Sequence, residues 1–250
     1  PNFIPMPFDG QVVITVHDLS CFEHPEYHPK DRVDEMQRLL PAAIERANGI
    51  VVISKATEQR LYHWFPESMG KTQVVYPGVD RRFKPTDARS VAVKLTHYSL
   101  ENQRYFLCVG TLEPRKNLPV LFRAYEQLPR SVRSSLPLVV VGSEGWLTDD
   151  VHRSAMRLKD QGCLRFIGFV SDADLPALYQ GAMAVCYPSR YEGFGLPAAE
   201  AMACGSPVIT SNTTSLPEVV GDAGISLDPD DVDGFCNHLL SLYENADLRA

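Results

Sequence analysis

The chain has 250 residues and a net charge of −7, so one large or two modest domains are expected and nothing in the charge favours nucleic-acid binding. Its composition is ordinary for a globular protein, and no apolar run reaches the roughly 18 residues that a membrane span requires. The six cysteines include no Cys-x-x-Cys pair, which favours reduced cysteines packed in the interior over a disulfide framework or a zinc site. These features predict a cytoplasmic protein without a transmembrane segment, and peripheral contact with the inner face of a membrane stays open.

Residues 1–82 contain three predicted strands and two predicted helices. The strands are expected from their β-branched and apolar residues, at 11–16, 50–53 and 73–76. One helix is expected at 31–48, where Pro41 should kink or divide it, and one at 55–64, where Ser54 should be the N-cap. Because a parallel sheet covered on both faces usually has more strands, we expect residues 1–82 to be an incomplete N-terminal domain of a longer natural chain.

From residue 83 onward the chain alternates apolar strands with helical segments. Strands are expected at 105–110, 137–142, 164–168, 182–187, 207–210 and 224–227. Helices are expected at 87–100, 117–128, 147–160, 172–180, 197–204, 215–221 and 230–243. Strict alternation predicts a parallel, doubly wound sheet, in which ligands bind at the carboxyl ends of the strands. We therefore expect residues 83–250 to be a Rossmann-like domain, joined to the first by the polar stretch 81–104.

A basic loop follows the first strand of this second domain, with the sequence Gly110-Thr-Leu-Glu-Pro-Arg-Lys-Asn117. Arg115 and Lys116 precede a helix whose expected N-cap is Asn117, so two cations and a helix N-terminus converge. A diphosphate carries about two to three negative charges, and such a site suits it because Arg binds bidentately and Lys acts as a point charge. A solvated basic turn is the alternative interpretation of these residues.

A glycine-containing loop joins the strand at 182–187 to a short helix, in the stretch Tyr187-Pro-Ser-Arg-Tyr-Glu-Gly-Phe-Gly-Leu-Pro-Ala-Ala-Glu-Ala-Met-Ala-Cys-Gly205. Unpaired first-turn N–H groups and the positive end of the helix dipole predict an anion site. Gly193 and Gly195 are expected to let a phosphate or a sugar approach the backbone. Glu192 and Glu200 bracket this site, and carboxylates accept hydrogen bonds from vicinal hydroxyls of a ribose or hexose. For either glutamate alone, an exposed charge or a helix-dipole partner is the simpler explanation.

The run from Glu192 to Gly205 closely resembles the donor-binding signature of the retaining glycosyltransferases of family four, which use nucleotide sugars. The resemblance implies the GT-B fold, an α/β architecture of two Rossmann-like doubly wound domains. It implies that Glu192 contacts the transferred sugar and that Glu200 holds the ribose. The main-chain amides of Gly193, Phe194, Gly195 and Leu196 would hold the diphosphate.

The run Glu113-Pro-Arg-Lys-Asn117 also resembles the diphosphate loop of that family. The resemblance implies that Arg115 and Lys116 stabilise the leaving nucleoside diphosphate, with Gly110 and Thr111 beside the donor. Many relatives carry a further Arg at the position of Thr111, so one positive contact expected from the family is absent here.

Two more segments resemble donor-site elements of the family. Val16-His-Asp-Leu19 resembles the element whose histidine lies beside the donor sugar, which implies that role for His17; a structural or exposed histidine is the alternative. Gly168-Phe169-Val170, followed by a helix capped near Ser171, resembles the loop that meets the nucleobase. An ordinary connection between a strand and a helix explains this loop equally well.

The resemblance implies retaining transfer of a hexose from a nucleotide sugar to a glycan or lipid-linked acceptor, without a metal or other cofactor. The loop 110–117 resembles that of many bacterial mannosyltransferases of surface-polysaccharide synthesis, which favours GDP-mannose over the UDP-sugars that remain open. Two alternatives are a catalytically inactive nucleotide-sugar-binding module and a sugar-nucleotide epimerase with the same fold.

Overall fold

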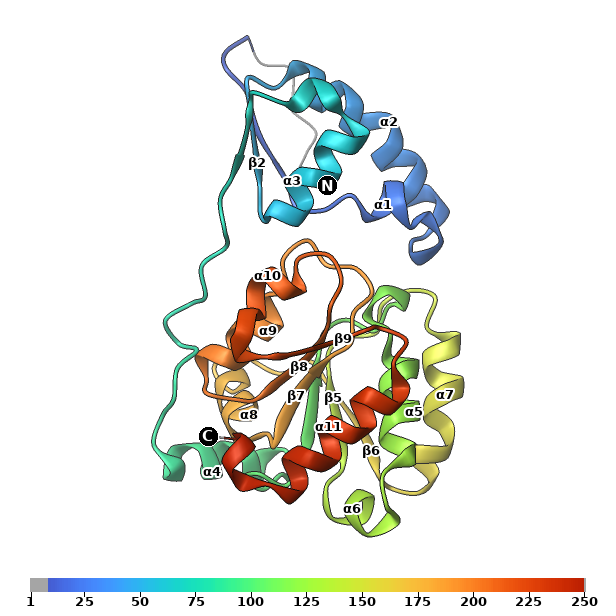
Figure 1. Cartoon of the computed structure of the whole chain (residues 1–250), viewed down its shortest axis with the longest axis vertical. Helices are drawn as coiled ribbons and strands as arrows, with labels where there is room; N and C mark the ends of the chain where they lie inside the picture. Colours follow the sequence, from blue (N-terminus) through green and yellow to red (C-terminus); the bar gives the residue numbers. More distant parts are fainter. Residues whose placement is uncertain (1–8, 250) are drawn as a thin grey trace.

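The computed structural model describes residues 9–249, which form an upper and a lower α/β unit in Figure 1. The first eight residues of the expected N-terminal domain, and the last residue of the chain, lie outside the described part. An extended segment runs down from the upper unit to α4 (Ala88–His97), which packs against α8 (Leu175–Gly181) of the lower unit. None of the helices within residues 9–249 is both long enough and apolar enough to cross a membrane.

The upper unit is a small parallel sheet with helices packed on it. Its strands are β1 (Val13–Val16), β2 (Gly49–Val52) and β3 (Thr72–Val74), in the order β1-β2-β3. Its helices and short 3-10 turns are α1 (Ser20–Glu23), η1 (Pro25–Tyr27), α2 (Lys30–Arg46), α3 (Lys55–Trp64) and η2 (Pro66–Ser68). The three strands and the two longer helices therefore lie close to the positions predicted from sequence.

Helix α2 differs in one respect from the sequence prediction. It continues through Pro41 as a single helix, so Pro41 does not divide it, and the alternative expectation of a kink stays a prediction. The proline removes one helical hydrogen bond at a cost of about 3 kcal/mol. Leu40, Ala43 and Ile44 flank it and are fully buried in the core of the unit, and burial of such side chains contributes about 1.5–3 kcal/mol each for the larger ones. Packing on the sheet thus outweighs the local disruption.

The lower unit is a six-stranded parallel sheet in the order β6-β5-β4-β7-β8-β9. The strands are β4 (Phe106–Val109), β5 (Leu138–Val141), β6 (Leu164–Gly168), β7 (Ala184–Tyr187), β8 (Val208–Ser211) and β9 (Ile225–Leu227). Helices α5 (Leu118–Gln127), α7 (Asp149–Asp160) and α11 (Val232–Glu244) share one apolar core with one face of the sheet. Helices α4, α8, α9 (Leu196–Ala203) and α10 (Leu216–Val220) share the core on the other face. The doubly wound parallel sheet predicted from the alternating pattern is confirmed.

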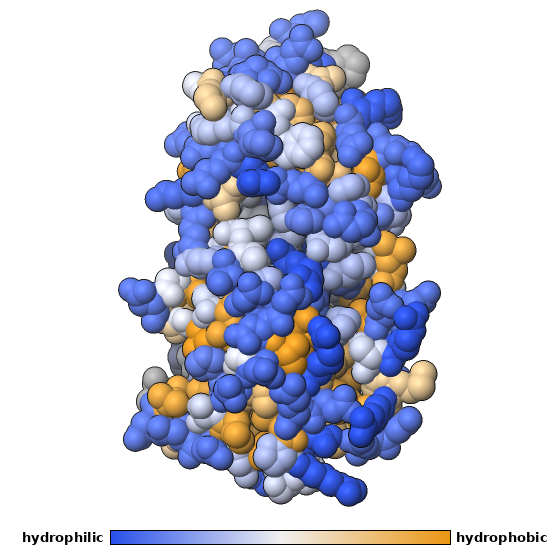
Figure 2. Space-filling model, turned by 45° about the vertical axis from the view of Figure 1, so that its right-hand side comes forward, coloured by the Kyte–Doolittle hydropathy of each residue, from blue (hydrophilic) through white to orange (hydrophobic). Residues whose placement is uncertain are grey.

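The remaining elements of the lower unit are short connections. A helix that the sequence did not predict, α6 (Arg130–Ser135), follows α5, and η3 (Pro114–Lys116), η4 (Gly221–Ala223) and η5 (Ala246–Arg249) are single 3-10 turns. Helix α8 begins at Leu175, three residues later than expected, because residues 172–174 form a turn in which the Ser171 hydroxyl bonds to Asp174. The face of the molecule in Figure 2 is mostly hydrophilic, with apolar side chains scattered over the lower unit.

The two units are joined by hydrogen bonds as well as by the chain. Ser54, the N-cap of α3 as predicted, donates its hydroxyl to the main-chain oxygen of Gly193 at 2.7 Å. Thr57 donates to the same oxygen at 3.1 Å. The Glu218 carboxylate of α10 accepts bonds from the main-chain N–H groups of Lys55 and Ala56 at 2.9 and 3.3 Å. The start of α3 is therefore fastened to the loop that carries Gly193 and to α10.

Candidate functional site

The strand order of the lower sheet brings two loops together. The chain moves outward from β4 to β6 on one side and from β7 to β9 on the other, so the order reverses between β4 and β7. In open parallel sheets the loops at such a switch point form the ligand crevice. Here they are residues 110–117 after β4 and 188–195 after β7. They are bonded directly, since the Arg190 N–H donates to the Arg115 main-chain oxygen at 2.8 Å.

Four charged side chains meet where these loops touch. The Glu192 carboxylate lies 2.6 Å from the Arg115 guanidinium and 2.7 Å from the Lys116 ammonium. A second carboxylate, that of Glu113, lies 2.6 Å from the other edge of Arg115. Two cations and two anions thus form one compact, charge-balanced cluster.

Burial makes the charges in this cluster interact strongly. Glu192 is only 7% exposed and Glu113 only 2% exposed. Burial by itself would raise the pKa of Glu192, but Lys116 and Arg115 outweigh it and hold that pKa at about 2. Burial opposes the charged form of Arg115, and the two glutamates outweigh it and raise its pKa. Glu192 and Arg115 are therefore both ionised at neutral pH.

The loop that carries Glu192 is held from behind by the loop before α10. The N–H of Glu192 donates to the Thr214 hydroxyl at 3.0 Å. The Ser215 hydroxyl donates toward two main-chain oxygens, that of Glu192 at 3.0 Å and that of Phe194 at 2.7 Å. These bonds fix the main chain on both sides of Gly193 and leave the Glu192 side chain to the cluster.

The two glycines of this loop have a further role that was not expected from sequence. A Cβ at Gly193 would overlap the main-chain carbonyl of His17, and a Cβ at Gly195 would lie 2.7 Å from the Leu216 side chain. The absent side chains therefore admit neighbouring parts of the protein, and the expectation that they also let a ligand approach the main chain stays a prediction. Gly195 also adopts a left-handed conformation, with φ 112°, that favours glycine.

Gly193→Ala is expected to weaken the contact between the two units. The new methyl group requires β1 or the loop to move, which disturbs the bonds that Ser54 and Thr57 make to Gly193. Overpacking of this kind costs about 1–3 kcal/mol, which urea unfolding would measure. Gly78→Ala is the matched control, because a Cβ there meets nothing within 4 Å. Equal stability of the two variants would show that the close approach of His17 to Gly193 does not exist.

Glu200 lies just over one turn into α9, eight residues after Glu192. Its side chain is half-buried and accepts a hydrogen bond from the Tyr179 hydroxyl at 3.0 Å. Burial raises the pKa of Glu200, and the bond from Tyr179 acts in the opposite direction. The Glu192 carboxylate is thus paired with two cations, whereas the Glu200 carboxylate is only half-buried and has one hydrogen bond from a tyrosine.

The other residues assigned from sequence fall around this region. His17 follows β1 with its main chain against Gly193, and its side chain is exposed. Gly110 packs against the Lys116 side chain, and Thr111 is exposed. Phe169 is 76% exposed, whereas Val170 is buried in the core.

Asn117 is the N-cap residue of α5, as predicted, but its side chain makes no capping hydrogen bond to the helix. It adopts a left-handed conformation, and its amide donates to the main-chain oxygens of Pro188 and Pro229 at 3.1 and 2.7 Å. This arrangement ties the two site loops to the segment before α11.

Sequence reasoning missed three residues that support the site. Glu113 pairs with Arg115, Tyr179 donates to Glu200, and the Tyr187 hydroxyl accepts a bond from the Lys116 ammonium at 2.7 Å. Tyr187 also places its ring 4.9 Å from that ammonium. The available signal was the presence of a polar atom on each of these residues inside or beside apolar runs, because a buried polar atom needs a partner.

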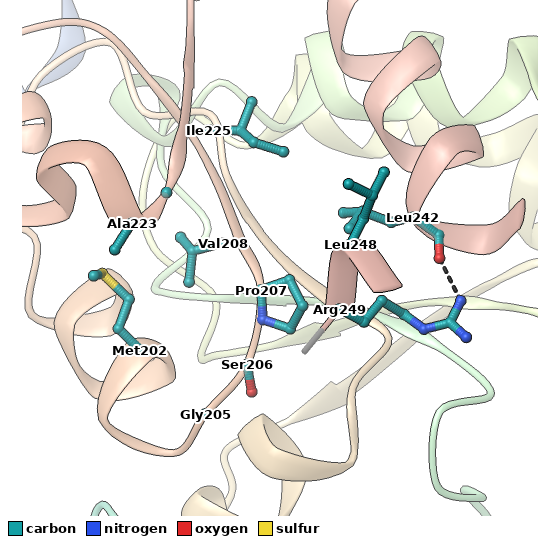
Figure 3. Close-up of a pocket in the computed structure, with 11 residues that line it drawn as sticks. Met202, Gly205, Ser206, Pro207, Val208, Ala223, Ile225, Leu242, Leu248 and Arg249 are labelled. Atoms are coloured by element: carbon teal, nitrogen blue, oxygen red, sulfur yellow. Dashed lines mark hydrogen bonds between the residues drawn. The ribbon is translucent and has the colours of Figure 1, made fainter. Parts of the chain in front are cut away.

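A pocket of about 300 Å³ lies away from this site (Figure 3). It is lined by the residues that lead into β8 and β9 and by Leu242, Leu248 and Arg249, so it is at the amino ends of those strands. Arg249 donates to the Leu242 main-chain oxygen, which turns its guanidinium toward α11. The charged cluster belongs to the carboxyl ends of the strands, so this pocket is separate from it.

Several known proteins resemble this chain in sequence. A family model described as glycosyl transferases group 1 matches residues 96–250. The O-antigen chain mannosyltransferase B of Escherichia coli is 40% identical over 249 residues, which are 100% of this chain and 65% of that protein. The serotype-specific mannosyltransferase WbdA of Escherichia coli is 32% identical over 231 residues, which are 89% of this chain and 28% of that protein. The chain thus spans less than two thirds of the length of each relative.

A solved structure shares the fold. The Anabaena protein HepE, crystallised in complex with UDP and glucose, superposes with a TM-score of 0.78 at 23% sequence identity. The similarity covers 96% of this chain and 63% of that protein. At this identity the comparison supports the fold of both units and not their substrates.

Proposed function

The chain belongs to the group 1 glycosyl transferase family, and on that premise we propose that it carries the donor site of a retaining hexosyltransferase. The observation that carries the proposal is the buried cluster of Arg115, Lys116, Glu192 and Glu113 at the switch point of the lower sheet. Two fixed cations at the carboxyl ends of parallel strands suit a diphosphate, and preorganised charge of this kind is a large term in transfer from a diphosphate leaving group.

In this proposal the diphosphate competes with Glu192 for the two cations. Arg115 and Lys116, with main-chain amides of residues 193–196, hold the phosphate oxygens as negative charge develops on the leaving group. Glu192, released from part of its pairing, accepts hydrogen bonds from hydroxyls of the sugar. His17 contacts the sugar from the upper unit, and Glu200 holds the ribose.

The reaction then needs no metal and no protein nucleophile. The acceptor hydroxyl attacks the anomeric carbon from the face that the diphosphate leaves. A phosphate oxygen takes the hydroxyl proton, and because attack and departure occur on the same face, the configuration at the anomeric carbon is retained. The protein contributes positioning of the two reactants and stabilisation of the leaving group.

We assign mannose as the transferred sugar and GDP-mannose as the donor. The relatives at 40% and 32% identity are both called mannosyltransferases, which supports the sugar. The name of the first refers to an O-antigen chain, which supports a glycan or lipid-linked acceptor. UDP-glucose is the competing donor, because HepE was crystallised with UDP and glucose.

A nucleotide panel tests this function. Thermal unfolding is followed with GDP, UDP, GDP-mannose and UDP-glucose, each up to millimolar concentration, and release of free sugar is measured with the two donors. A ligand at about 100 times its Kd should stabilise the protein by about 2.7 kcal/mol. We expect GDP and GDP-mannose to stabilise it and GDP-mannose to be hydrolysed slowly. Stabilisation without sugar release would favour a binding module, and no effect of any nucleotide would overturn the proposal.

A further inference from the structure

Tyr179 is a buried tyrosine whose hydroxyl reaches the half-buried Glu200. Its side chain is completely buried, and the hydroxyl lies 3.0 Å from one carboxylate oxygen, Oε2, of Glu200. Tyr179 belongs to α8 and Glu200 to α9, which pack against each other on one face of the sheet. The bond therefore connects the interior of the fold to a side chain assigned to the ligand.

The position of Tyr179 is itself fixed on several sides. Its main-chain oxygen accepts bonds from the Ala182 N–H at 3.0 Å and from the Ser206 hydroxyl. Its ring centroid lies 6.0 Å from that of Phe83, which packs on the same core. A tyrosine held in this way has little freedom to move with Glu200. The position of the Tyr179 hydroxyl therefore determines the orientation of the Glu200 carboxylate.

We infer that Tyr179 is a positioning residue that holds Oε2 of Glu200 and leaves Oε1 directed to the ribose hydroxyls of the donor nucleotide. The inference rests on the proposed function, because it assumes that a nucleoside diphosphate binds beside α9. A carboxylate has two oxygens, and a bond to one of them restricts rotation of the whole group. A hydrogen bond to an ionised group is also stronger than one between neutral groups, so the restriction is firm.

This role predicts how the affinity for a nucleotide depends on its ribose hydroxyls, not on its phosphates. In the wild-type protein, a correctly aimed Glu200 should favour GDP over 2′,3′-dideoxy-GDP by roughly tenfold or more, since one charge-assisted bond is lost. Without the Tyr179 hydroxyl, Glu200 is no longer aimed and the preference should fall to about twofold. The affinity for the dideoxy nucleotide should change little, because it makes no bond to Glu200.

The test compares Tyr179→Phe with Tyr105→Phe. Tyr105 is also completely buried in the same apolar core, but its hydroxyl donates to the Leu178 main-chain oxygen at 2.6 Å and not to a site residue. Kd is measured by calorimetry for GDP, UDP and their 2′,3′-dideoxy forms. The ratio of the two Kd values for one base does not depend on how much of a variant is folded, because both nucleotides bind the same folded population.

A double-mutant cycle separates positioning from a general structural effect. Tyr179→Phe should reduce the ribose preference sharply in the wild-type background and change nothing further once Glu200→Ala is present. Tyr105→Phe should keep the wild-type ratio. An unchanged ratio in Tyr179→Phe, or an equal loss in Tyr105→Phe, would overturn the inference. If wild-type protein binds no nucleotide, the proposed function fails with it; if it binds but shows no ribose preference, the inference and the ribose role of Glu200 fail while the diphosphate site stands.

Discussion

Glu192→Gln is expected to reduce donor turnover by at least about 100-fold while leaving the affinity for GDP unchanged or increased. Glu192 would contact the sugar only when the donor is in place, so its loss removes an interaction with the reacting part and not with the nucleotide. Glu192 also neutralises Arg115 and Lys116. With that anion gone, the two cations attract a diphosphate without an internal competitor.

The same substitution should also destabilise the free protein. Removing one partner of a buried ion pair costs about 3–5 kcal/mol, because the remaining charges stay buried and unpaired. GDP should recover much of this loss, since its phosphates replace the missing anion. The measurements are donor hydrolysis, GDP affinity by calorimetry, and unfolding in urea with and without GDP.

Glu67→Gln is the control for this experiment, because Glu67 is an exposed glutamate of the upper unit in the 3-10 turn η2. It should change neither stability nor turnover by a measurable amount. If Glu192→Gln weakens GDP binding as much as it lowers turnover, then Glu192 does not act on the sugar. If its stability equals that of the control, the buried pairing with Arg115 and Lys116 is not present in solution.

The architecture of the lower unit was predictable because its signals are local. Each strand from β4 to β9 is a short apolar run, and each is followed by a helical pattern, so alternation alone implies the parallel sheet. Figure 1 shows the helices on both faces that this pattern requires. The same parallel sheet predicted that the charged loops after β4 and β7 form one site, because the carboxyl ends of parallel strands lie at the same edge.

The pairing within the site could not be predicted in the same way. Arg115 and Glu192 are 77 residues apart, and nothing local indicates that Glu192 turns toward the cations. Sequence reasoning placed the cations and the carboxylate in separate subsites, for diphosphate and for sugar. The structure adds that they neutralise each other, because buried charges need partners.

Tertiary contacts at Pro41, Asn117 and Gly193 go beyond what local rules describe. Local rules associate a proline with a kink or break in a helix, an asparagine with a helix cap and a glycine with ligand access. The structure adds core packing around Pro41, two distant carbonyl groups that the Asn117 side chain binds, and the main chain of His17 against Gly193. Such contacts depend on the finished fold and leave no periodic trace in the sequence.

Arg115→Ala combined with Lys116→Ala is expected to weaken GDP binding by at least about 100-fold. Each cation should supply one or more charge-assisted hydrogen bonds to the diphosphate, worth about 1.5–3 kcal/mol each. Loss of stability is also expected, because Glu192 and Glu113 are left buried without cations. Calorimetry with GDP and with guanosine would separate lost contact with the diphosphate from lost stability. Guanosine lacks the phosphates, so it should bind the wild-type protein and the double variant equally.

A compensated variant distinguishes lost binding from lost folding. Lys116→Gln with Glu192→Gln removes one charge of each sign from the cluster, so stability should exceed that of the double alanine variant while GDP binding stays weaker than in wild type. Arg153→Ala, which breaks an exposed pair with Asp150 on α7, should leave GDP binding unchanged. If the double alanine variant binds GDP with wild-type affinity, the diphosphate does not lie against this cluster, and the donor site must be sought elsewhere on the sheet.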